Sequence, residues 1–269
     1  MTITREQFDI LILMAEENGP FPRGQLERKT GCFSGTAERA MKELMGLGYV
    51  NDEGITDAGM AALEPYRVKR AIFIAAGFGS RLVPITLNTP KPLIRVHGVR
   101  IIDRMIDACL EAGINEIYIV RGYLADQFDQ LLYKYPMIKF LENPVYNEAN
   151  NISSSMVARY MLSNAYVFEA DLLISNPKII TKYHYTSDFL AIRKKRSDDW
   201  CFEVRDGIIT KEMVGGEDCW QMVGISYWNE DDGRRLSQDI PDVYSSAGGK
   251  ERYWEQVPLV YKKDRYKVE

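Results

Sequence analysis

A buried strand that runs directly into a glycine-containing loop constrains this chain more than any other feature. Residues 71–74 are apolar and stop abruptly at the small residues of the segment 75–79. This pattern is typical of a central strand that ends in a tight loop. Small residues let the backbone approach a ligand closely, and successive free N–H groups can bind an anion. We therefore expect a phosphate cradle at Ala75, Ala76, Gly77 and Gly79.

Two cations follow this loop. Arg81 comes two residues after Gly79, and Lys91 lies within the segment Thr89-Pro90-Lys91-Pro92. A guanidinium fork and an ammonium group together suit a polyphosphate. The spacing matches neither a P-loop, which needs Gly-Lys-Ser/Thr together, nor the dinucleotide fingerprint, which needs a third glycine that opens a helix. A packed strand-to-loop turn without a ligand is the structural alternative.

Composition predicts an ordinary cytoplasmic protein. The chain has 269 residues, of which 46% are hydrophobic and 27% charged, with a net charge of −4. This charge gives no global attraction to nucleic acid or to an anionic membrane. No apolar run is long enough to span a bilayer, and the start of the chain does not resemble a signal peptide. The cysteines form no paired motif and indicate reduced structural thiols, not a zinc site: Cys32, Cys109, Cys201 and Cys219.

Residues 1–67 have the pattern of a winged helix-turn-helix domain. A capping box at Thr4–Gln7 opens a first helix, a short helix fits 22–30, and Ser34 can cap a third helix. A small hairpin over 49–56 and a last helix near 57–64 complete the outline.

The charge of this predicted domain argues against DNA binding. Residues 1–67 contain seven Lys/Arg and eleven Asp/Glu, a net charge of −4. DNA-binding modules normally carry a basic face, whereas the expected wing tip here carries Asp52 and Glu53. We therefore expect a packing, dimerising or regulatory module, which leaves a homodimer open.

From residue 68 the pattern changes to alternating strands and helices. This rhythm predicts an α/β fold, a doubly wound mixed sheet of Rossmann-like type, in which ligands lie outside the carboxyl ends of the strands. After Asp171 the pattern becomes hairpin-like and is expected to build the acceptor side of a cleft. The predicted domains are 1–67 and 68–269. The expected strands are 71–74, 117–120, 138–141 and 166–169, and the expected helices are 101–109, 124–134 and 151–162.

The loop sequence AAGFGSRL followed by NTPKPL resembles the signature of the nucleoside-triphosphate transferase family, whose members join a nucleotide to a sugar phosphate or an alcohol phosphate. Within that family, residues 68–269 look most similar to the bacterial CTP:phosphocholine cytidylyltransferases. The matching segments are Gly122-Tyr123, Asn150-Asn151, Glu169-Ala170-Asp171, Asp199-Trp200 and Tyr253-Trp254-Glu255.

This resemblance implies roles for individual residues. Lys91 would hold the α-phosphate and the acceptor phosphate, and Arg81 the β- and γ-phosphates. Asp171 and Glu255 would bind Mg²⁺, which takes few protein ligands and keeps water; the family commonly has Asp where this chain has Glu255. Residues implied to face the base and ribose are Gly122, Tyr123, Asn150 and Asn151.

The implied reaction is transfer of CMP from CTP to phosphocholine, which gives CDP-choline and pyrophosphate. Trp200, Tyr253 and Trp254 would surround the choline group. The acceptor phosphate is mostly a dianion at neutral pH and needs no general base, which fits a chain whose only histidines are His97 and His184. Three alternatives stay open: a cytidylyltransferase for phosphoethanolamine or 2-aminoethylphosphonate, a sugar-phosphate nucleotidyltransferase, and a nucleotide-sensing transcriptional regulator.

Overall fold

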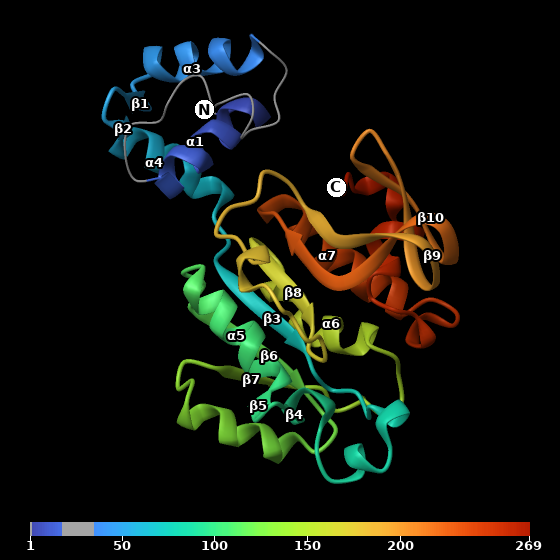
Figure 1. Ribbon diagram of the computed structural model, residues 1–269. Coiled ribbons are helices and arrows are strands. Elements are labelled where there is room, and N and C mark those ends of the chain that lie inside the picture. The colour runs from blue at the N-terminus through green and yellow to red at the C-terminus, as the bar shows by residue number, and fades with distance from the viewer. Residues whose placement is uncertain (1, 18–34) are drawn as a thin grey trace. The chain divides into compact units, whose positions relative to one another are not determined.

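The chain forms two compact units, Met1–Arg67 and Val68–Glu269. A computed structural model describes residues 2–17 and 35–269 (Figure 1). Each unit has its own secondary structure and its own buried residues, and each is described separately below. Within the described residues, no helix is both long and apolar enough to cross a membrane.

The first unit contains helices and one small hairpin. Thr4 and Gln7 form the expected reciprocal cap: the Thr4 N–H donates to Gln7 Oε1 at 3.0 Å, and the Gln7 N–H donates to Thr4 Oγ1 at 3.3 Å. The expected helix over 22–30 and the cap at Ser34 lie outside the described residues, so a complete winged helix-turn-helix stays a prediction. The described elements are α1 (Arg5–Glu17), α3 (Thr36–Gly46), β1 (Val50–Asn51), β2 (Gly54–Ile55), α4 (Asp57–Leu63) and the 3-10 helix Glu64–Tyr66.

The second unit is built on a six-stranded mixed sheet with the strand order β7-β6-β3-β8-β10-β9. The first four strands in that order are parallel, and β10 pairs antiparallel with both β8 and β9. The α/β fold predicted from the sequence is therefore present. The strands are β3 (Arg70–Ile74), β6 (Glu116–Arg121), β7 (Lys139–Glu142), β8 (Ala165–Glu169), β9 (Asp188–Arg205) and β10 (Ile208–Trp228).

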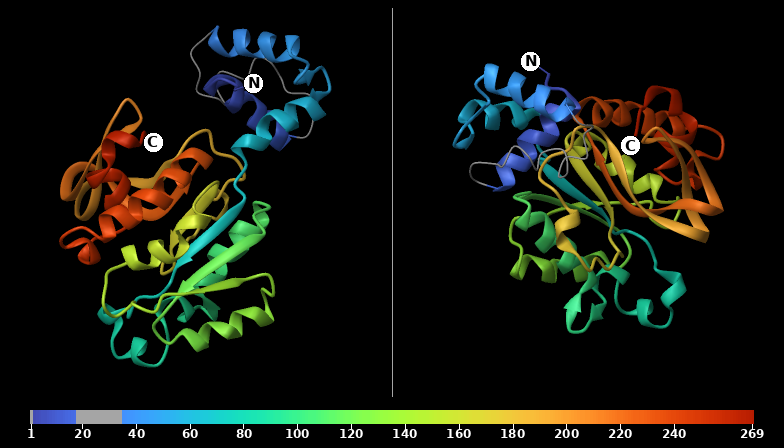
Figure 2. Two further views of the ribbon diagram at one scale, coloured as in Figure 1. Left: turned by 180° about the vertical axis from the view of Figure 1, so that it is seen from behind. Right: turned by 45° about the horizontal axis from the view of Figure 1, so that its top comes forward.

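Helices cover both faces of this sheet (Figures 1 and 2). Because side chains alternate along a strand, Ala71 and Phe73 of β3 join one core, whereas Ile72 and Ile74 join the other. The first core includes α5 (Ile101–Glu111) and the 3-10 helix Ala125–Tyr133. The second includes α6 (Ile152–Ala158) and α7 (Glu230–Tyr244). This arrangement leaves the carboxyl ends of the parallel strands free to carry a site.

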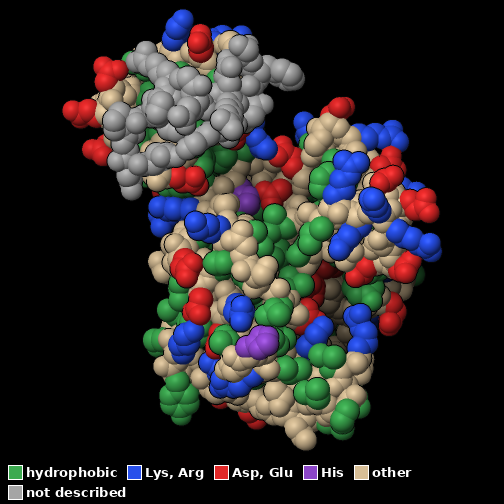
Figure 3. All heavy atoms as spheres, viewed as in Figure 1, with side chains coloured by type: hydrophobic (Ala, Val, Ile, Leu, Met, Phe, Trp, Pro, Cys, Tyr) green, Lys and Arg blue, Asp and Glu red, His purple; other side chains and the backbone are tan. Residues whose placement is uncertain are grey.

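Strands β9 and β10 form a long twisted ribbon after the parallel strands. Acidic and basic side chains are interspersed over this ribbon (Figure 3). Its pairing contains several register shifts, one of them between Val214 and Gly216; such irregularities bend a strand and re-aim its side chains. The ribbon thereby curves away from the plane of the main sheet. The described cysteines, Cys109, Cys201 and Cys219, are free and buried.

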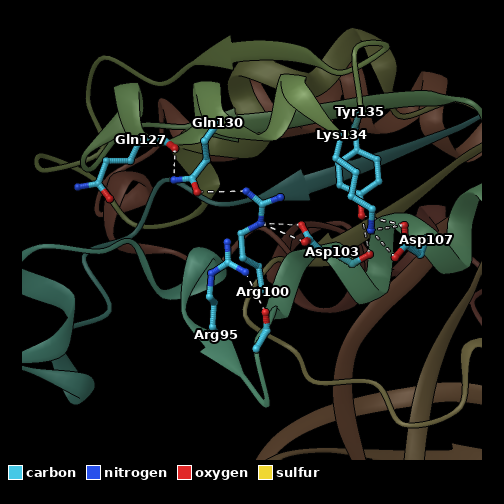
Figure 4. Close-up of polar contacts among 9 residues, drawn as sticks. Arg95, Arg100, Asp103, Asp107, Gln127, Gln130, Lys134 and Tyr135 are labelled. Atoms are coloured by element: carbon cyan, nitrogen blue, oxygen red, sulfur yellow. Dashed lines mark hydrogen bonds and ion pairs between the residues drawn. The ribbon is translucent and has the colours of Figure 1, made fainter.

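A polar network fixes helix α5 against the 3-10 helix Ala125–Tyr133 (Figure 4). Arg100 precedes α5, and its guanidinium donates to both carboxylate oxygens of Asp103 at 3.0 Å and to Gln130 Oε1 at 3.1 Å. One turn further on, Asp107 accepts from Tyr135 Oη at 2.8 Å and from Lys134 Nζ at 2.8 Å. These bonds hold two helices that cover the same face of the sheet.

Helix α7 was not predicted from the sequence. Its N-terminus is capped by Asn229, whose side chain accepts from the Asp232 N–H. Gly233 lies so close to the residues after α6 that an added Cβ would sit 2.5 Å from the Leu162 carbonyl oxygen. The remaining short elements are β4 (Arg95–Val96), β5 (Val99–Arg100), the one-turn π-helix Val257–Tyr261, and 3-10 helices at Ser80–Leu82, Ile85–Leu87, Lys91–Leu93, Arg159–Met161, Pro177–Ile179, Gly249–Glu251 and Lys263–Arg265.

Candidate active site

The loop after β3 is anchored at the carboxyl end of the parallel strands. The Ala75 N–H donates to the Val120 carbonyl at 2.9 Å, and the Ala76 carbonyl accepts from the Tyr123 N–H at 3.1 Å. Gly79 has a φ of +63°, a conformation that favours glycine. An added Cβ at Gly79 would lie 3.0 Å from Thr86 Cγ2. The loop therefore needs glycine at this position for both its backbone conformation and its packing.

A cavity of about 510 Å³ opens over this loop. It lies at the carboxyl ends of β3 and β8, where doubly wound sheets bind their ligands. The structure thus brings together most of the phosphate, nucleotide and metal residues predicted from the sequence. Predicted residues that line the cavity are Ala75, Ala76, Gly77, Gly79, Lys91, Asn150, Asn151 and Asp171, and further lining residues include Phe78, Asn143, Tyr146, Ser153, Ser154, Glu169 and Glu251.

Lys91 and Asp171 form an ion pair inside this cavity. Lys91 opens the 3-10 helix Lys91–Leu93, and Asp171 follows β8 by two residues. Between them, the Ala170 N–H donates to the Ile74 carbonyl at 3.2 Å and ties the end of β8 to the start of the loop. A cation and a carboxylate therefore face each other at the point where a nucleotide phosphate would meet the loop.

Gly122 and Tyr123 are not among the residues that line this cavity, and their contact with base and ribose stays a prediction. An added Cβ at Gly122 would lie 2.7 Å from Tyr146 Cβ, so this glycine makes room for Tyr146. Tyr123 Oη donates to the Thr86 carbonyl at 3.0 Å, and its ring packs against Phe78 with centroids 5.0 Å apart. Gly122 thus packs against Tyr146 and Tyr123 against Phe78, two residues that do line the cavity.

The two adjacent asparagines use their side chains to connect chain segments. Asn150 Nδ2 donates to the Glu251 carbonyl at 3.3 Å. Asn151 Nδ2 donates to Glu169 Oε1 at 3.1 Å and to Glu255 Oε2 at 3.4 Å, while its Oδ1 accepts from the Trp254 N–H at 2.9 Å. Both border the cavity, and these bonds also bring the segment 251–255 to the end of β8.

Asn151 sits beside a pair of acids, Glu169 and Glu255. Burial raises the pKa of Glu169 well above its ordinary value, and the nearby charges of Glu255 and Asp171 raise it further. Burial likewise raises the pKa of Glu255, which is 3% exposed. Gly224 makes room for this pair, because an added Cβ there would lie 2.9 Å from Glu169 Cγ. No role was predicted for Glu169 from the sequence, although its position two residues before Asp171 is a signal for one.

The donor set at the cavity fits a magnesium ion in part. Asp171 and Glu169 both line the cavity, whereas Glu255 contacts Glu169 from behind and is buried. Across the described residues, no group of three or more His, Cys, Asp or Glu side chains is arranged to hold a metal. Mg²⁺ needs only one or two protein carboxylates when phosphate oxygens and water complete its shell. Asp171 is therefore the residue best placed to hold it, with the two glutamates behind.

Arg81 borders a second cavity, of about 500 Å³. The two cations that follow the loop in sequence thus lie on different cavities, Lys91 on the first and Arg81 on the second. Arg81 lies in the 3-10 helix Ser80–Leu82, and the 3-10 helix Ile85–Leu87 lies between it and Lys91 and redirects the chain. The other residues that line the second cavity come from the β9–β10 ribbon: Lys194, Arg196, Ser197, Asp198, Asp199 and Gln221.

Only two of the three predicted choline-binding aromatics are accessible. The Trp200 and Tyr253 rings meet edge to face with centroids 5.5 Å apart, and Tyr253 is 41% exposed. Trp254 is 2% exposed and packs against Phe189 and Trp228 in the core. This burial argues against its predicted contact with an acceptor, because Phe189 stacks on the indole and Trp228 meets it edge to face.

Comparison with known proteins shows which family this chain belongs to. The family model for nucleotidyl transferases matches residues 70–198. The chain is 39% identical over 191 residues to 2-aminoethylphosphonate cytidylyltransferase of Lancefieldella rimae, an alignment that covers 70% of this chain and 78% of that protein. The chain belongs to the nucleotidyl transferase family. The match starts at the first residue of β3 and includes the loop, Lys91, Asp171 and the start of the ribbon.

A further relative and a solved structure cover the same unit. Choline-phosphate cytidylyltransferase of Streptococcus pneumoniae is 30% identical over 189 residues, which span 70% of this chain and 82% of that protein. A solved structure of CTP:phosphocholine cytidylyltransferase from Streptococcus pneumoniae superposes with a TM-score of 0.65 at 29% identity and covers 76% of this chain and 89% of that one. The architecture of the second unit is thus that of a Rossmann-like nucleotidyltransferase.

Proposed function

We propose that the protein transfers a cytidylyl group from CTP to a small zwitterionic acceptor, and that this acceptor is 2-aminoethylphosphonate. The observation that carries the reaction is the convergence of the glycine loop, Lys91 and Asp171 on one cavity at the carboxyl ends of β3 and β8. The relatives named above, two kinds of cytidylyltransferase, support CTP as the nucleotide.

The choice of acceptor rests on two observations and departs from the phosphocholine expected from the sequence. The aminoethylphosphonate enzyme of Lancefieldella rimae is 39% identical to this chain, whereas the choline-phosphate enzyme of Streptococcus pneumoniae is 30% identical. Trp254 lies in the core, so one face of the expected choline box is missing. A primary ammonium instead requires hydrogen-bond acceptors, which carboxylates provide.

The residues of the cavity fit an in-line displacement. A phosphonate oxygen of the acceptor attacks the α-phosphorus of CTP and forms a new P–O bond. The bond from that phosphorus to the bridging oxygen breaks, and its electron pair leaves with pyrophosphate. The acceptor is largely deprotonated at neutral pH, so it needs no general base. Consistent with this, His184 is held elsewhere, with Nδ1 2.5 Å from Asp188 Oδ2.

Each group in the cavity then has a defined task. The loop N–H groups and the Lys91 ammonium would hold the phosphate oxygens on which negative charge develops, the type of interaction that lowers such barriers most. Asp171 would hold Mg²⁺, which would neutralise phosphate charge when bound. The Lys91–Asp171 ion pair keeps both side chains over the loop.

Phosphocholine remains the second candidate because of the Trp200–Tyr253 pair. Their rings meet at an interplanar angle of 64°, and two aromatic faces can hold a quaternary ammonium at about 0.5 to 2 kcal/mol each. A sugar phosphate has less support, because the two curated relatives named above are cytidylyltransferases for 2-aminoethylphosphonate and choline phosphate.

A substrate panel tests the proposal. Pyrophosphate release should be measured with CTP, UTP and dTTP against 2-aminoethylphosphonate, phosphoethanolamine, phosphocholine and glucose 1-phosphate. We expect the highest kcat/KM for CTP with 2-aminoethylphosphonate. A higher value for phosphocholine would overturn the acceptor and keep the nucleotide, whereas no release with any pair would overturn the reaction.

A further inference from the structure

The second cavity carries charges of both signs. Arg81 reaches it from the loop after β3, Lys194 and Arg196 from β9, and Asp198 and Asp199 from a bend further along the same strand, opposite the register shift between Val214 and Gly216. All five residues are exposed. Acidic and basic side chains mingle over this ribbon in the space-filling view (Figure 3).

These charges do not neutralise one another. Among the residues that the structure describes, no ion pair joins a cation of this cavity to Asp198 or Asp199, and Lys194 and Arg196 form no ion pair at all. Elsewhere in this unit, neighbouring opposite charges do pair, as Arg205 and Glu203 do at 2.5 Å on the same ribbon. Separated charges in one cavity are complementary to a ligand that carries both signs.

The acidic bend is held in place by hydrogen bonds. Ser197 Oγ donates to Gln221 Oε1 at 3.0 Å and accepts from the Asp199 N–H at 3.1 Å, and Ser197 is 9% exposed. One Asp199 oxygen accepts from the Trp200 N–H at 2.8 Å. These bonds fix the bend relative to the two cations that precede it and leave carboxylate oxygens for a ligand.

Strand geometry separates the cations into two groups. Side chains alternate along a strand, so Lys194 and Arg196 share one face of β9 and Lys195 lies on the other. Lys194 and Arg196 line the cavity, and Lys195 does not. Lys194 and Arg196 therefore form a two-cation site, and Lys195, between them in sequence, lies on the opposite face of the strand.

The cavity also lies close to the proposed reaction site. Gly79 lines the first cavity and Arg81 the second. Two residues span at most about 7 Å of chain. A ligand in the second cavity could therefore present a phosphonate oxygen to a nucleotide held over the loop.

We propose that this second cavity is the acceptor subsite, and that it binds an aminoalkylphosphonate as a zwitterion. Lys194 and Arg196 contact the phosphonate, and Asp198 and Asp199 contact the ammonium, with the Trp200–Tyr253 pair beside it. This inference rests on the proposed function and adds the residues that select the acceptor. A primary ammonium donates hydrogen bonds to the carboxylates, whereas a quaternary one cannot.

Ligands that lack one charge separate the two halves of the subsite. Calorimetric titrations with 2-aminoethylphosphonate and with ethylphosphonate should compare the wild type with the double variants Lys194→Ala/Arg196→Ala and Asp198→Asn/Asp199→Asn. Loss of the cations should weaken both ligands at least tenfold. Loss of the carboxylates should weaken 2-aminoethylphosphonate at least tenfold and leave ethylphosphonate within twofold or improve it.

Lys195→Ala is the matched control, because it removes a neighbouring cation from the other face of the strand. It should bind both ligands as the wild type does, and circular dichroism should show all variants folded. If either double variant is unfolded, the corresponding single variants Arg196→Gln and Asp198→Asn carry the test, with an expected loss of at least threefold.

Two results would overturn the subsite. One is equal binding of 2-aminoethylphosphonate by the wild type and both double variants. The other is a raised KM for CTP in Lys194→Ala/Arg196→Ala with an unchanged KM for the acceptor, which would assign the cavity to the nucleotide. Because the titrations need no turnover, they separate failure of the subsite from failure of the proposed reaction.

Discussion

At the scale of single residues, the site is dominated by carboxyl groups that hold protons more tightly than usual. Glu169 and Glu255 share a hydrogen bond, and burial raises the pKa of each. Burial raises the pKa of Glu212 on β10 to about 7, and the charge of Glu255 contributes. Such clusters of perturbed acids mark functional sites more often than structural ones. Here the charge of Asp171, the carboxylate proposed to hold the metal, acts on Glu169.

Replacement of Asp171 by asparagine should remove most of the magnesium dependence of turnover. Asp171 is the carboxylate at the cavity that pairs with Lys91, and an amide binds Mg²⁺ far more weakly than a carboxylate does. We expect pyrophosphate release in Asp171→Asn to fall at least a hundredfold at saturating Mg²⁺. Near wild-type release in this variant would make the assignment wrong.

The Lys91→Ala variant should lose rate and keep its fold. Removal of one cation aimed at developing charge costs on the order of 3 kcal/mol, about a hundredfold in rate. Lys91 is half-buried, and its ammonium pairs with Asp171 at the cavity, so its loss should not disrupt the core. Single-turnover rates and circular dichroism on the same sample check this. An unchanged rate would contradict the role.

Glu212 gives a prediction for stability against pH. Its pKa is raised from 4.5 to about 7 in the folded protein, so the folded state binds a proton that the unfolded state has already released. The associated stability is fully present below pH 4.5 and is lost as pH rises through 7. Because Glu212 is half-buried, we expect this loss to be about 1 to 3 kcal/mol.

The Glu212→Gln variant checks this predicted loss of stability with rising pH, because glutamine stays neutral at every pH. Between pH 5 and pH 8, urea unfolding should show the wild type losing about 1 to 3 kcal/mol more stability than Glu212→Gln. Parallel stability curves for the two proteins would show that the carboxyl group titrates normally.

At the scale of elements, the loop after β3 is the part of the chain that we propose holds the nucleotide phosphates. Gly79→Ala should strain this loop twice: its φ of +63° disfavours a side chain, and the new methyl group would meet Thr86 at 3.0 Å. We expect kcat/KM for CTP to fall at least tenfold. Gly98→Ala is the matched control, because Gly98 has a φ of +82° and an added Cβ there would meet nothing within 4 Å. Equal kinetic effects in both variants would refute a special role for the loop.

The same loop shows what local sequence can predict. An apolar run that stops at glycines is typical of a strand that ends in a tight loop, so β3 and its loop could be predicted from the residues alone. The positions of Lys91 and Arg81 did not follow, because the turns between them send the two side chains to separate cavities. Sequence spacing gives the length of the chain between two residues and not its direction.

Long-range packing explains the other differences. Tyr253 and Trp254 are adjacent in sequence, but Tyr253 is exposed and Trp254 enters the core. Both residues were predicted to surround the choline group. Glu169 gained no predicted role because the partner that perturbs it, Glu255, comes from the far end of the unit. Neither arrangement could be read from a short segment of sequence.

At the scale of the whole molecule, the charge is unevenly divided between the two units. Residues 1–67 carry seven Lys/Arg and eleven Asp/Glu, a net charge of −4, which is also the net charge of the whole chain. The second unit is therefore neutral overall. Neither unit supplies the net positive charge that attracts nucleic acid over a long range.

We therefore expect the protein to bind duplex DNA weakly and with little dependence on salt. Each phosphate that a protein neutralises steepens the fall of affinity with salt, and a protein with 6 to 10 phosphate contacts loses roughly a thousandfold or more between about 50 and 200 mM salt. Here the hairpin between β1 and β2 has Asp52 and Glu53 at its tip, and these carboxylates repel phosphate. Titration of a fluorescent duplex at both salt concentrations should give dissociation constants weaker than about 10 μM that change less than about tenfold.

A variant that reverses the charge of the hairpin tip shows whether charge is the reason. Asp52→Lys/Glu53→Lys replaces two exposed acids by two bases, and if the fold of this unit can dock on a duplex, it should bind DNA more tightly than the wild type and with a steeper dependence on salt. Sub-micromolar affinity of the wild type that collapses between the two salt concentrations would contradict this view of the first unit. Such a result would favour the alternative that the protein is a transcriptional regulator, against which the acidic charge of the first unit now argues.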